Sequence, residues 1–142
     1  MSLTLPADIE PHLIDGHDWN DPGVYCLSLT VPSDVRERWE CEFEQTPDYL
    51  DMVEKKPRTA YVGAAKNVMA RLEDHRDGDV RKVALLRVCE IDGVHNIHWF
   101  DTADDAFKHE WGIANLMSQQ RPEFYVHQRK CKLSWIAFSS TF

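Results

Sequence analysis

The sequence predicts a single domain of the α+β (α/β) class, in which helices flank a small mixed β-sheet. The 142 residues, of which 43% are hydrophobic, suffice for one core and leave little room for a second, so residues 1–142 are read as one unit. Short apolar runs, some of them alternating with polar residues, indicate strands. Between them lie segments with apolar residues every three or four positions, which indicate helices. The expected order is strand, helical excursion, strand, helix, β-hairpin, helix and strand.

A loose arm and a first strand are expected at the beginning of the chain. Residues 1–22 contain three prolines and one glycine, which favour an irregular arm or loop. Residues 24–29, Val-Tyr-Cys-Leu-Ser-Leu, alternate well enough to predict a strand.

Residues 33–56 are expected to be helical. Ser33 or Asp34 could cap a first helix, and the Thr-Pro pair at 46–47 is a second start signal. Pro57 would end the second helix. The two helices carry a set of aromatic and aliphatic side chains, namely Trp39, Phe43, Tyr49 and Leu50.

A second strand and a helix follow. Residues 60–63, Ala-Tyr-Val-Gly, predict a short strand that ends in glycine. Asn67 is a suitable N-cap for a helix over 66–76, which the Asp-Gly pair at 77–78 ends. The spacing i, i+3, i+4, i+7 puts two apolar and two cationic or titratable side chains on one face of this helix: Val68, Arg71, Leu72 and His75.

The next segment is expected to be a hairpin. Residues 83–91 and 94–100 both have strand character, and the Asp-Gly pair at 92–93 between them is a turn signal.

A long helix and one more strand complete the expected fold. Thr102 and Asp105 resemble an N-terminal capping arrangement for a helix over 103–120, and residues 124–142 have patches of strand character. One stripe of the helix carries a carboxylate among apolar side chains: Ala103, Phe107, Glu110, Ala114 and Met117.

The charge is acidic and unevenly placed. The net charge of −8 is unlike that of a typical nucleic-acid binder. Residues 1–54 carry 13 acidic and 2 basic side chains, whereas residues 55–87 carry 4 acidic and 9 basic ones. The basic middle is therefore a candidate local site for an anion.

Cysteine spacing and hydropathy favour a cytoplasmic protein with no membrane partner. The four cysteines form no Cys-x-x-Cys pair, so reduced and mostly buried thiols are expected. No apolar run is long enough to cross a membrane, and the N-terminal residues show no secretion signal.

Three segments together carry a family resemblance. They are Gly23-Val24-Tyr25, the run YVGAAKNVMARLEDH at 61–75, and the run AFKHEWGIANLMSQQRPEF at 106–124. Over these residues, with an insertion inside them, the chain resembles the GIY-YIG nuclease family, which includes the catalytic domains of homing endonucleases and excision-repair nucleases. The resemblance implies a GIY-YIG-like fold and metal-dependent hydrolysis of DNA phosphodiester bonds.

The residues themselves suit this chemistry. Phosphodiester cleavage needs an activated water, a cation to hold the phosphate and a way to offset the developing negative charge. Arg71 and His75 share a helix face, so both can point at one phosphate, and the planar fork of Arg71 matches phosphate oxygens. Glu110 offers oxygen to one hard divalent ion, Mg²⁺ or Mn²⁺, with waters completing the shell.

The resemblance also implies roles for single residues. Tyr25 is the favoured base or water-positioning group, and Tyr61 hydrogen-bonds in the same site. Arg71, His75 and Glu110 complete the expected catalytic set, with Glu110 as the metal ligand. An unperturbed tyrosine has a pKa of about 10, so neither tyrosine is a good base at neutral pH without help from a cation or a metal. Which of them is the base stays open.

The sequence departs from the family pattern at several positions. Many members have lysine directly after the second motif, where this chain has Ala64; Lys66, two positions on, is the candidate phosphate contact in its place. Tyr125 stands where asparagine is common. Tyr25 and Tyr61 are 36 residues apart, further than is usual, because residues 31–58 form an insertion.

Each candidate residue also has an ordinary structural interpretation. The two tyrosines could be half-buried strand residues, and Arg71 an exposed helix arginine. His75 could be a cation at a helix C-terminus, and Glu110 could lie at the edge of its stripe. Their joint spacing favours the functional interpretation.

Two functions are therefore considered. The first is a metal-dependent DNA endonuclease without its own DNA-recognition domain, which would bind DNA weakly and with little sequence preference. The alternative is a catalytically inactive GIY-YIG-like module that binds protein or nucleic acid. The aromatic face of the insertion could pack on the domain, or meet a protein partner or a second copy.

Overall fold

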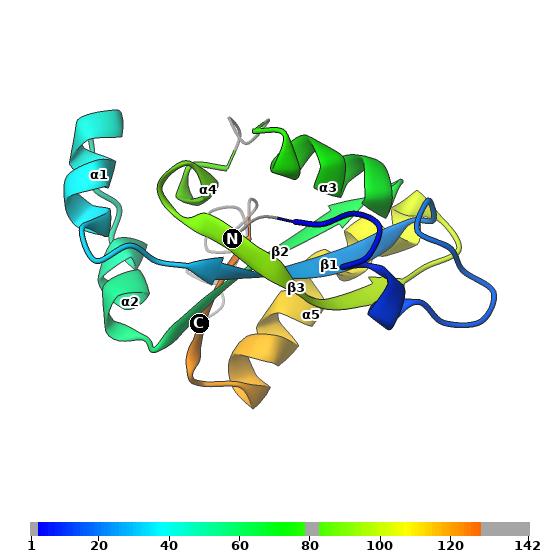
Figure 1. Cartoon of the computed structure of the whole chain (residues 1–142). Coiled ribbons are helices and arrows are strands. Elements are labelled where there is room, and N and C mark those ends of the chain that lie inside the picture. The colour runs from blue at the N-terminus through cyan, green and yellow to red at the C-terminus, as the bar shows by residue number, and fades with distance from the viewer. Residues whose placement is uncertain (1–2, 79–82, 129–142) are drawn as a thin grey trace.

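The fold is a four-stranded mixed sheet with helices on both faces (Figure 1). The computed structural model describes residues 3–78 and 83–128. The strand order is β3-β1-β2-β4. β1 (Gly23–Thr30) lies antiparallel to both β2 (Arg58–Ala65) and β3 (Glu90–Trp99), and β4 (Phe124–Gln128) runs parallel to β2. The predicted α+β class with a small mixed sheet is confirmed.

Alternation along the central strands separates two apolar layers. Successive residues of a strand point to opposite faces, so the odd-numbered residues of β1 and β2 share one face and the even-numbered residues the other. The first face belongs to the core of Tyr25, Leu27, Leu29, Tyr61, Ala65, Val68 and Leu72. The second belongs to the cluster of Val24, Cys26, Ala60, Val62, Ala106, Ala114 and Phe124.

The helices divide between these two faces. α3 (Val68–Arg76) and the single turn α4 (Leu85–Val88) contribute to the first core, whereas α5 (Ala103–Gln120) covers the second. Figure 1 shows α3 and α5 on opposite sides of the sheet. The predicted caps of α3 and α5 are confirmed. The side chain of Asn67 accepts a hydrogen bond from the Ala70 amide, and that of Thr102 accepts one from the Asp105 amide.

The predicted hairpin over residues 83–100 is wrong. Residues 85–88 form α4, and β3 runs unbroken through the Asp-Gly pair at 92–93. Its pairing with β1 shifts register twice, between Cys26 and Leu27 and between Ser28 and Leu29. At each shift β3 has one residue more than β1 and forms a bulge. The Asp-Gly pair lies at one of these bulges and does not form a turn.

The N-terminal arm is not loose, in contrast to the expectation from its prolines. It contains a short 3-10 helix, η1 (Glu10–His12), and its Leu3 and Ile9 are buried in the core that contains the tyrosines. The carbonyls of Trp19 and Asp21 accept hydrogen bonds from the first amides of α3, those of Met69 and Val68. Burial of apolar side chains therefore orders a segment that lacks regular structure.

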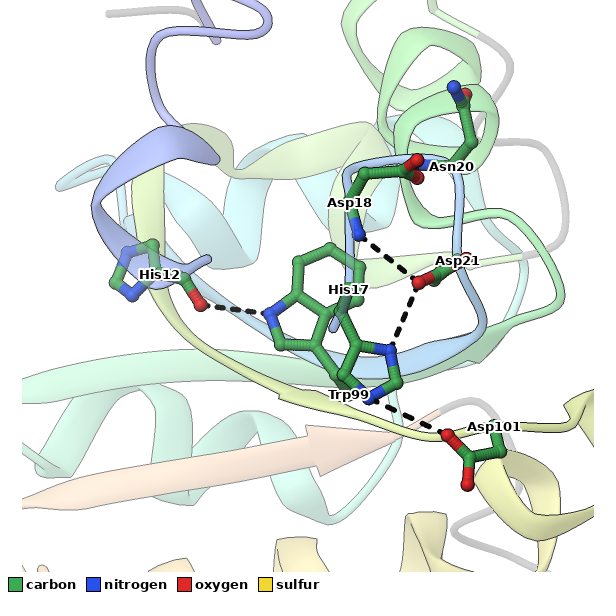
Figure 2. Close-up of polar contacts among 7 residues, drawn as sticks. All are labelled: His12, His17, Asp18, Asn20, Asp21, Trp99 and Asp101. Carbon is green, nitrogen blue, oxygen red and sulfur yellow. Dashed lines mark hydrogen bonds and ion pairs between the residues drawn. The ribbon is translucent and has the colours of Figure 1, made fainter. Parts of the chain in front are cut away.

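Polar contacts also hold the arm to the end of β3 (Figure 2). The indole nitrogen of Trp99 donates to the carbonyl of His12, and the ring of His17 stacks on that of Trp99. The imidazole of His17 bonds the carboxylate of Asp21 and lies 3.7 Å from that of Asp101. Residues 3–22 are thus an integral part of the domain.

The insertion folds as two short helices, as predicted. α1 (Val35–Glu42) and α2 (Tyr49–Lys55) are bridged by Arg36, which pairs with Asp51 and Glu54. The side chain of Asp34, at the start of α1, makes no capping bond and pairs with Arg38 instead. Among the four side chains of the predicted aromatic and aliphatic face, Trp39 and Leu50 are buried, and Phe43 and Tyr49 are partly buried against the same core. This face therefore packs on the domain.

Two further expectations are refined. Phe107 is exposed although it belongs to the predicted stripe of α5, whose buried positions are Ala106, Glu110 and Ala114. The last strand is confirmed for residues 124–128, and the remainder of the predicted segment, 129–142, lies outside the described residues.

Cys26 and Cys89 are buried free thiols, whereas Cys41 is exposed and free. None of the helices described is both long and apolar enough to cross a membrane.

Candidate active site

The two motif tyrosines meet over a glycine. Gly63 of β2 lies directly opposite Tyr25 of β1, and Tyr61 lies two residues before it on the same face. The rings of Tyr25 and Tyr61 are 6.2 Å apart between centroids. A Cβ atom on Gly63 would lie 2.5 Å from the Tyr25 hydroxyl oxygen and 3.0 Å from Cε2 of Tyr61. The absence of a side chain at Gly63 therefore creates the space that both rings occupy.

α3 brings His75 to the same place. Nε2 of His75 and the hydroxyl of Tyr25 form a buried hydrogen bond of 2.8 Å. The His75 ring also meets that of Tyr61 edge-on, at 6.0 Å between centroids. The predicted helix face is confirmed for Val68, Leu72 and His75, which are all buried. His75 is thus held between the two tyrosines and not in solvent at the helix end.

Arg71 lies at the more open side of this group. Its guanidinium is 3.7 Å from the carboxylate of Asp74, and about a quarter of its side chain is exposed. It also acts on Tyr25 through charge and hydrogen bonding, which favour the phenolate. Arg71 therefore connects the buried rings to the surface.

The Tyr25 hydroxyl is nevertheless a neutral phenol at physiological pH. Burial raises the pKa of Tyr25 well above its ordinary value, and the neighbouring Tyr61 adds to the rise. The Arg71 cation lowers the pKa, and the charge of Glu110 raises it further. Because burial is the largest cause, Tyr25 keeps its proton and can share it with His75.

Glu110 approaches from the other side of the sheet. It is buried on α5 between Ala106 and Ala114, which pack in the cluster of Val24 and Val62. The charge of Glu110 is the smallest of the causes that shift the pKa of Tyr25. The structure thus groups Tyr25, Tyr61, Arg71 and His75 closely on one face and sets Glu110 behind them.

The donor set suits a hard cation only in part. Within residues 3–78 and 83–128, no three His, Cys, Asp or Glu side chains come together as a metal site. Mg²⁺ often takes one or two protein carboxylates and fills its remaining positions with water and substrate phosphate. A single carboxylate at Glu110 fits that mode through its oxygen chemistry.

Lys66 does not join the buried group. It is exposed in the link between β2 and α3, one residue before the Asn67 cap. Its candidate role as a phosphate contact depends on a substrate reaching the N-terminal end of α3.

A hydrogen-bonded pair on β4, the half-buried Tyr125 and the buried His127, was missed by sequence reasoning. His127 lies directly beside Tyr61 in the parallel pairing of β4 with β2. Its Nδ1 is hydrogen-bonded to the hydroxyl of Tyr125 at 2.8 Å, and burial lowers the pKa of His127 to about 4. The i, i+2 spacing of Tyr125 and His127 in a strand indicates that they share a face. It does not indicate which strand β4 pairs with.

Comparisons of the chain with protein-family models, curated proteins and solved structures gave no match. The residues of the site and the resemblance in its motifs are therefore what points to a function.

Proposed function

We propose that the chain is a metal-dependent endonuclease that hydrolyses DNA phosphodiester bonds, with a site like that of GIY-YIG nucleases. The observation that carries the proposal is the convergence of Tyr25, Tyr61 and His75 over Gly63. These are residues of the motifs on which the resemblance rests, and they come from three separate elements. Arg71, on the same helix as His75, adds a cation that suits phosphate.

Each side chain has a separate role in the proposed hydrolysis. Arg71 binds phosphate oxygens with its planar fork. The hydroxyl of Tyr25 accepts a proton from the attacking water while it gives its own proton to Nε2 of His75. Because the pKa of Tyr25 is raised, this concerted transfer avoids a free phenolate. The water oxygen bonds to phosphorus as the bond to the leaving sugar oxygen breaks, and solvent protonates the leaving oxygen. Mg²⁺ or Mn²⁺, held through Glu110, would supply charge neutralisation at the phosphate. Because Glu110 lies on the α5 face of the sheet and Arg71 on the α3 face, this role requires the cluster to open locally when substrate binds.

The burial of the site favours the second candidate function. Tyr25 is only 1% exposed and Tyr61 only 2%, so a phosphodiester reaches Arg71 more readily than the rings. A scaffold that keeps these residues as a packed core would be a catalytically inactive module, acting in protein–protein or nucleic-acid binding. The nuclease proposal instead requires the cluster to open locally when substrate binds.

The acidic surface sets the expected binding behaviour. A net charge of −8 disfavours the phosphate contacts that dominate non-specific affinity, so DNA binding by this chain is proposed to be weak, with low sequence preference. The aromatic face of the insertion packs against the core of the domain and is not available to a partner. A protein partner or a second copy would therefore meet the acidic outer surface of α1 and α2.

Nicking of supercoiled plasmid with Mg²⁺ or Mn²⁺, at low and high salt, tests the proposal. The wild-type chain should nick only with metal, and Arg71→Ala and Glu110→Gln should each lower the rate by about a hundredfold or more. Arg76→Ala is the matched control, because Arg76 is on the same helix but pairs with Asp77. Folded protein that nicks under none of these conditions would support the inactive module instead.

A further inference from the structure

Tyr61 is held from two sides by imidazole rings. His75 of α3 lies on one side, at 6.0 Å between ring centroids, and His127 of β4 lies on the other, at 6.3 Å. His127 is the direct neighbour of Tyr61 across the β2–β4 pairing. The His127 ring therefore packs beside the Tyr61 ring.

The His127 ring is itself fixed. Its Nδ1 bonds the hydroxyl of Tyr125 at 2.8 Å, and only about 6% of the residue is exposed. Its lowered pKa keeps it neutral at physiological pH, so a single tautomer can be selected by that bond. A hydrogen bond to this buried ring restrains its orientation, because losing the Tyr125 hydroxyl would leave the buried His127 with an unsatisfied polar atom.

The pair also meets the insertion. The ring of Tyr49, the first residue of α2, stacks on that of Tyr125 at 5.9 Å with an interplanar angle of 9°. The same ring lies 4.7 Å from that of His127. A continuous line of ring contacts thus runs from α2 through β4 to Tyr61, and from there to His75 and Tyr25.

We propose that Tyr125 and His127 are positioning residues that fix Tyr61 in the site and connect the inserted helix α2 to it. The inference rests on the proposed nuclease function and adds residues to that same site. Neither side chain touches the Tyr25–His75 hydrogen bond directly, so their effect passes through Tyr61. The insertion then acts as a support for the site, and the parallel strand β4 is the element that transmits this support.

Tyr125→Phe is the sharpest test, because it deletes the hydroxyl that bonds His127 and keeps an aromatic ring against Tyr49. His127→Asn is the second variant, since its amide can still hydrogen-bond near the position of Nδ1, whereas His127→Leu cannot. His98→Asn on the edge strand β3 is the control, because His98 is also hydrogen-bonded, to Asn96, but is far from Tyr61 in the strand order.

The expected result is a fall in kcat of about tenfold for Tyr125→Phe and His127→Leu, with KM unchanged and the folded fraction equal to that of wild type. His127→Asn should recover part of the loss, and His98→Asn should nick like wild type. Nicking by Tyr125→Phe and His127→Leu at the wild-type rate would overturn the proposal. A rate loss that only tracks unfolding would overturn it as well.

A second measurement keeps this inference separate from the nuclease proposal. The ring signals of Tyr61 and His75 can be followed by NMR in the folded variants, without any substrate. Shifts of both signals in Tyr125→Phe, and none in His98→Asn, are expected even if the wild-type chain fails to nick DNA. Unchanged Tyr61 and His75 signals would show that the pair on β4 does not position Tyr61.

Discussion

The hydroxyl of Tyr25 and Nε2 of His75 form a 2.8 Å hydrogen bond between the central strand β1 and the last turn of α3. The two residues are 50 positions apart in the chain, and both are buried. The bond gives the first motif tyrosine a proton acceptor that does not depend on solvent.

Replacement of Tyr25 by Phe should abolish nicking and lower stability moderately. The variant keeps the ring but deprives His75 of its buried partner, which costs about 1–3 kcal/mol of unfolding free energy. Urea unfolding and plasmid nicking measure the two effects. Ser28→Ala on the same strand, facing the opposite side of the sheet, should change neither by more than a small amount. Full activity in Tyr25→Phe would remove Tyr25 from the proposed proton transfer.

Gly63→Ala should disrupt the site where the two rings meet. The added Cβ would lie 2.5 Å from the Tyr25 oxygen and 2.7 Å from its Cζ, so the ring must move. We expect a loss of about 1–3 kcal/mol in thermal or urea unfolding, typical of overpacking, together with loss of nicking. Gly112→Ala is the control. Its Cβ would meet nothing within 4 Å, and on the exposed face of α5 it should stabilise by about 0.5–1 kcal/mol.

The buried His127 should make stability depend on pH. Its pKa is lowered from 6.5 to about 4 in the folded protein, so between these values the unfolded chain binds the proton in preference. The contribution is fully present above about pH 6.5 and is lost as the pH falls toward 4, by about 3 kcal/mol in total. Urea unfolding from pH 7 to pH 4 measures it. The gap in stability between wild type and His127→Asn should narrow over this range; a constant gap would contradict the prediction.

The N-terminal arm should contribute to stability through Ile9. This side chain is 0% exposed and belongs to the core that contains both tyrosines. Ile9→Ala should therefore cost about 2–5 kcal/mol, as deletions in a close-packed core do. Ile14→Ala is the matched control on the same arm, because Ile14 is 59% exposed and should be close to neutral. Equal unfolding midpoints for the two variants would show that the arm is dispensable for the core.

Local signals predicted most of the elements correctly. The caps at Asn67 and Thr102, and the face of Val68, Leu72 and His75, depend on residues within two turns of one helix. The alternation in β1 likewise depends only on neighbouring residues. The hairpin at 92–93 failed because an Asp-Gly pair suits a turn and a bulge equally, and only pairing with β1 decides between them.

The candidate site shows the same division. Local sequence was enough to name the motif residues, to put Arg71 and His75 on one helix face, and to indicate the class of chemistry that such groups support. Three relationships are visible only in the folded chain: Tyr25 lies opposite Gly63, Glu110 approaches from the other face, and His127 lies beside Tyr61. These relationships join residues far apart in the chain. They depend on strand register and helix packing, which are set by the burial of the whole core. The local periodicity of the sequence does not predict them.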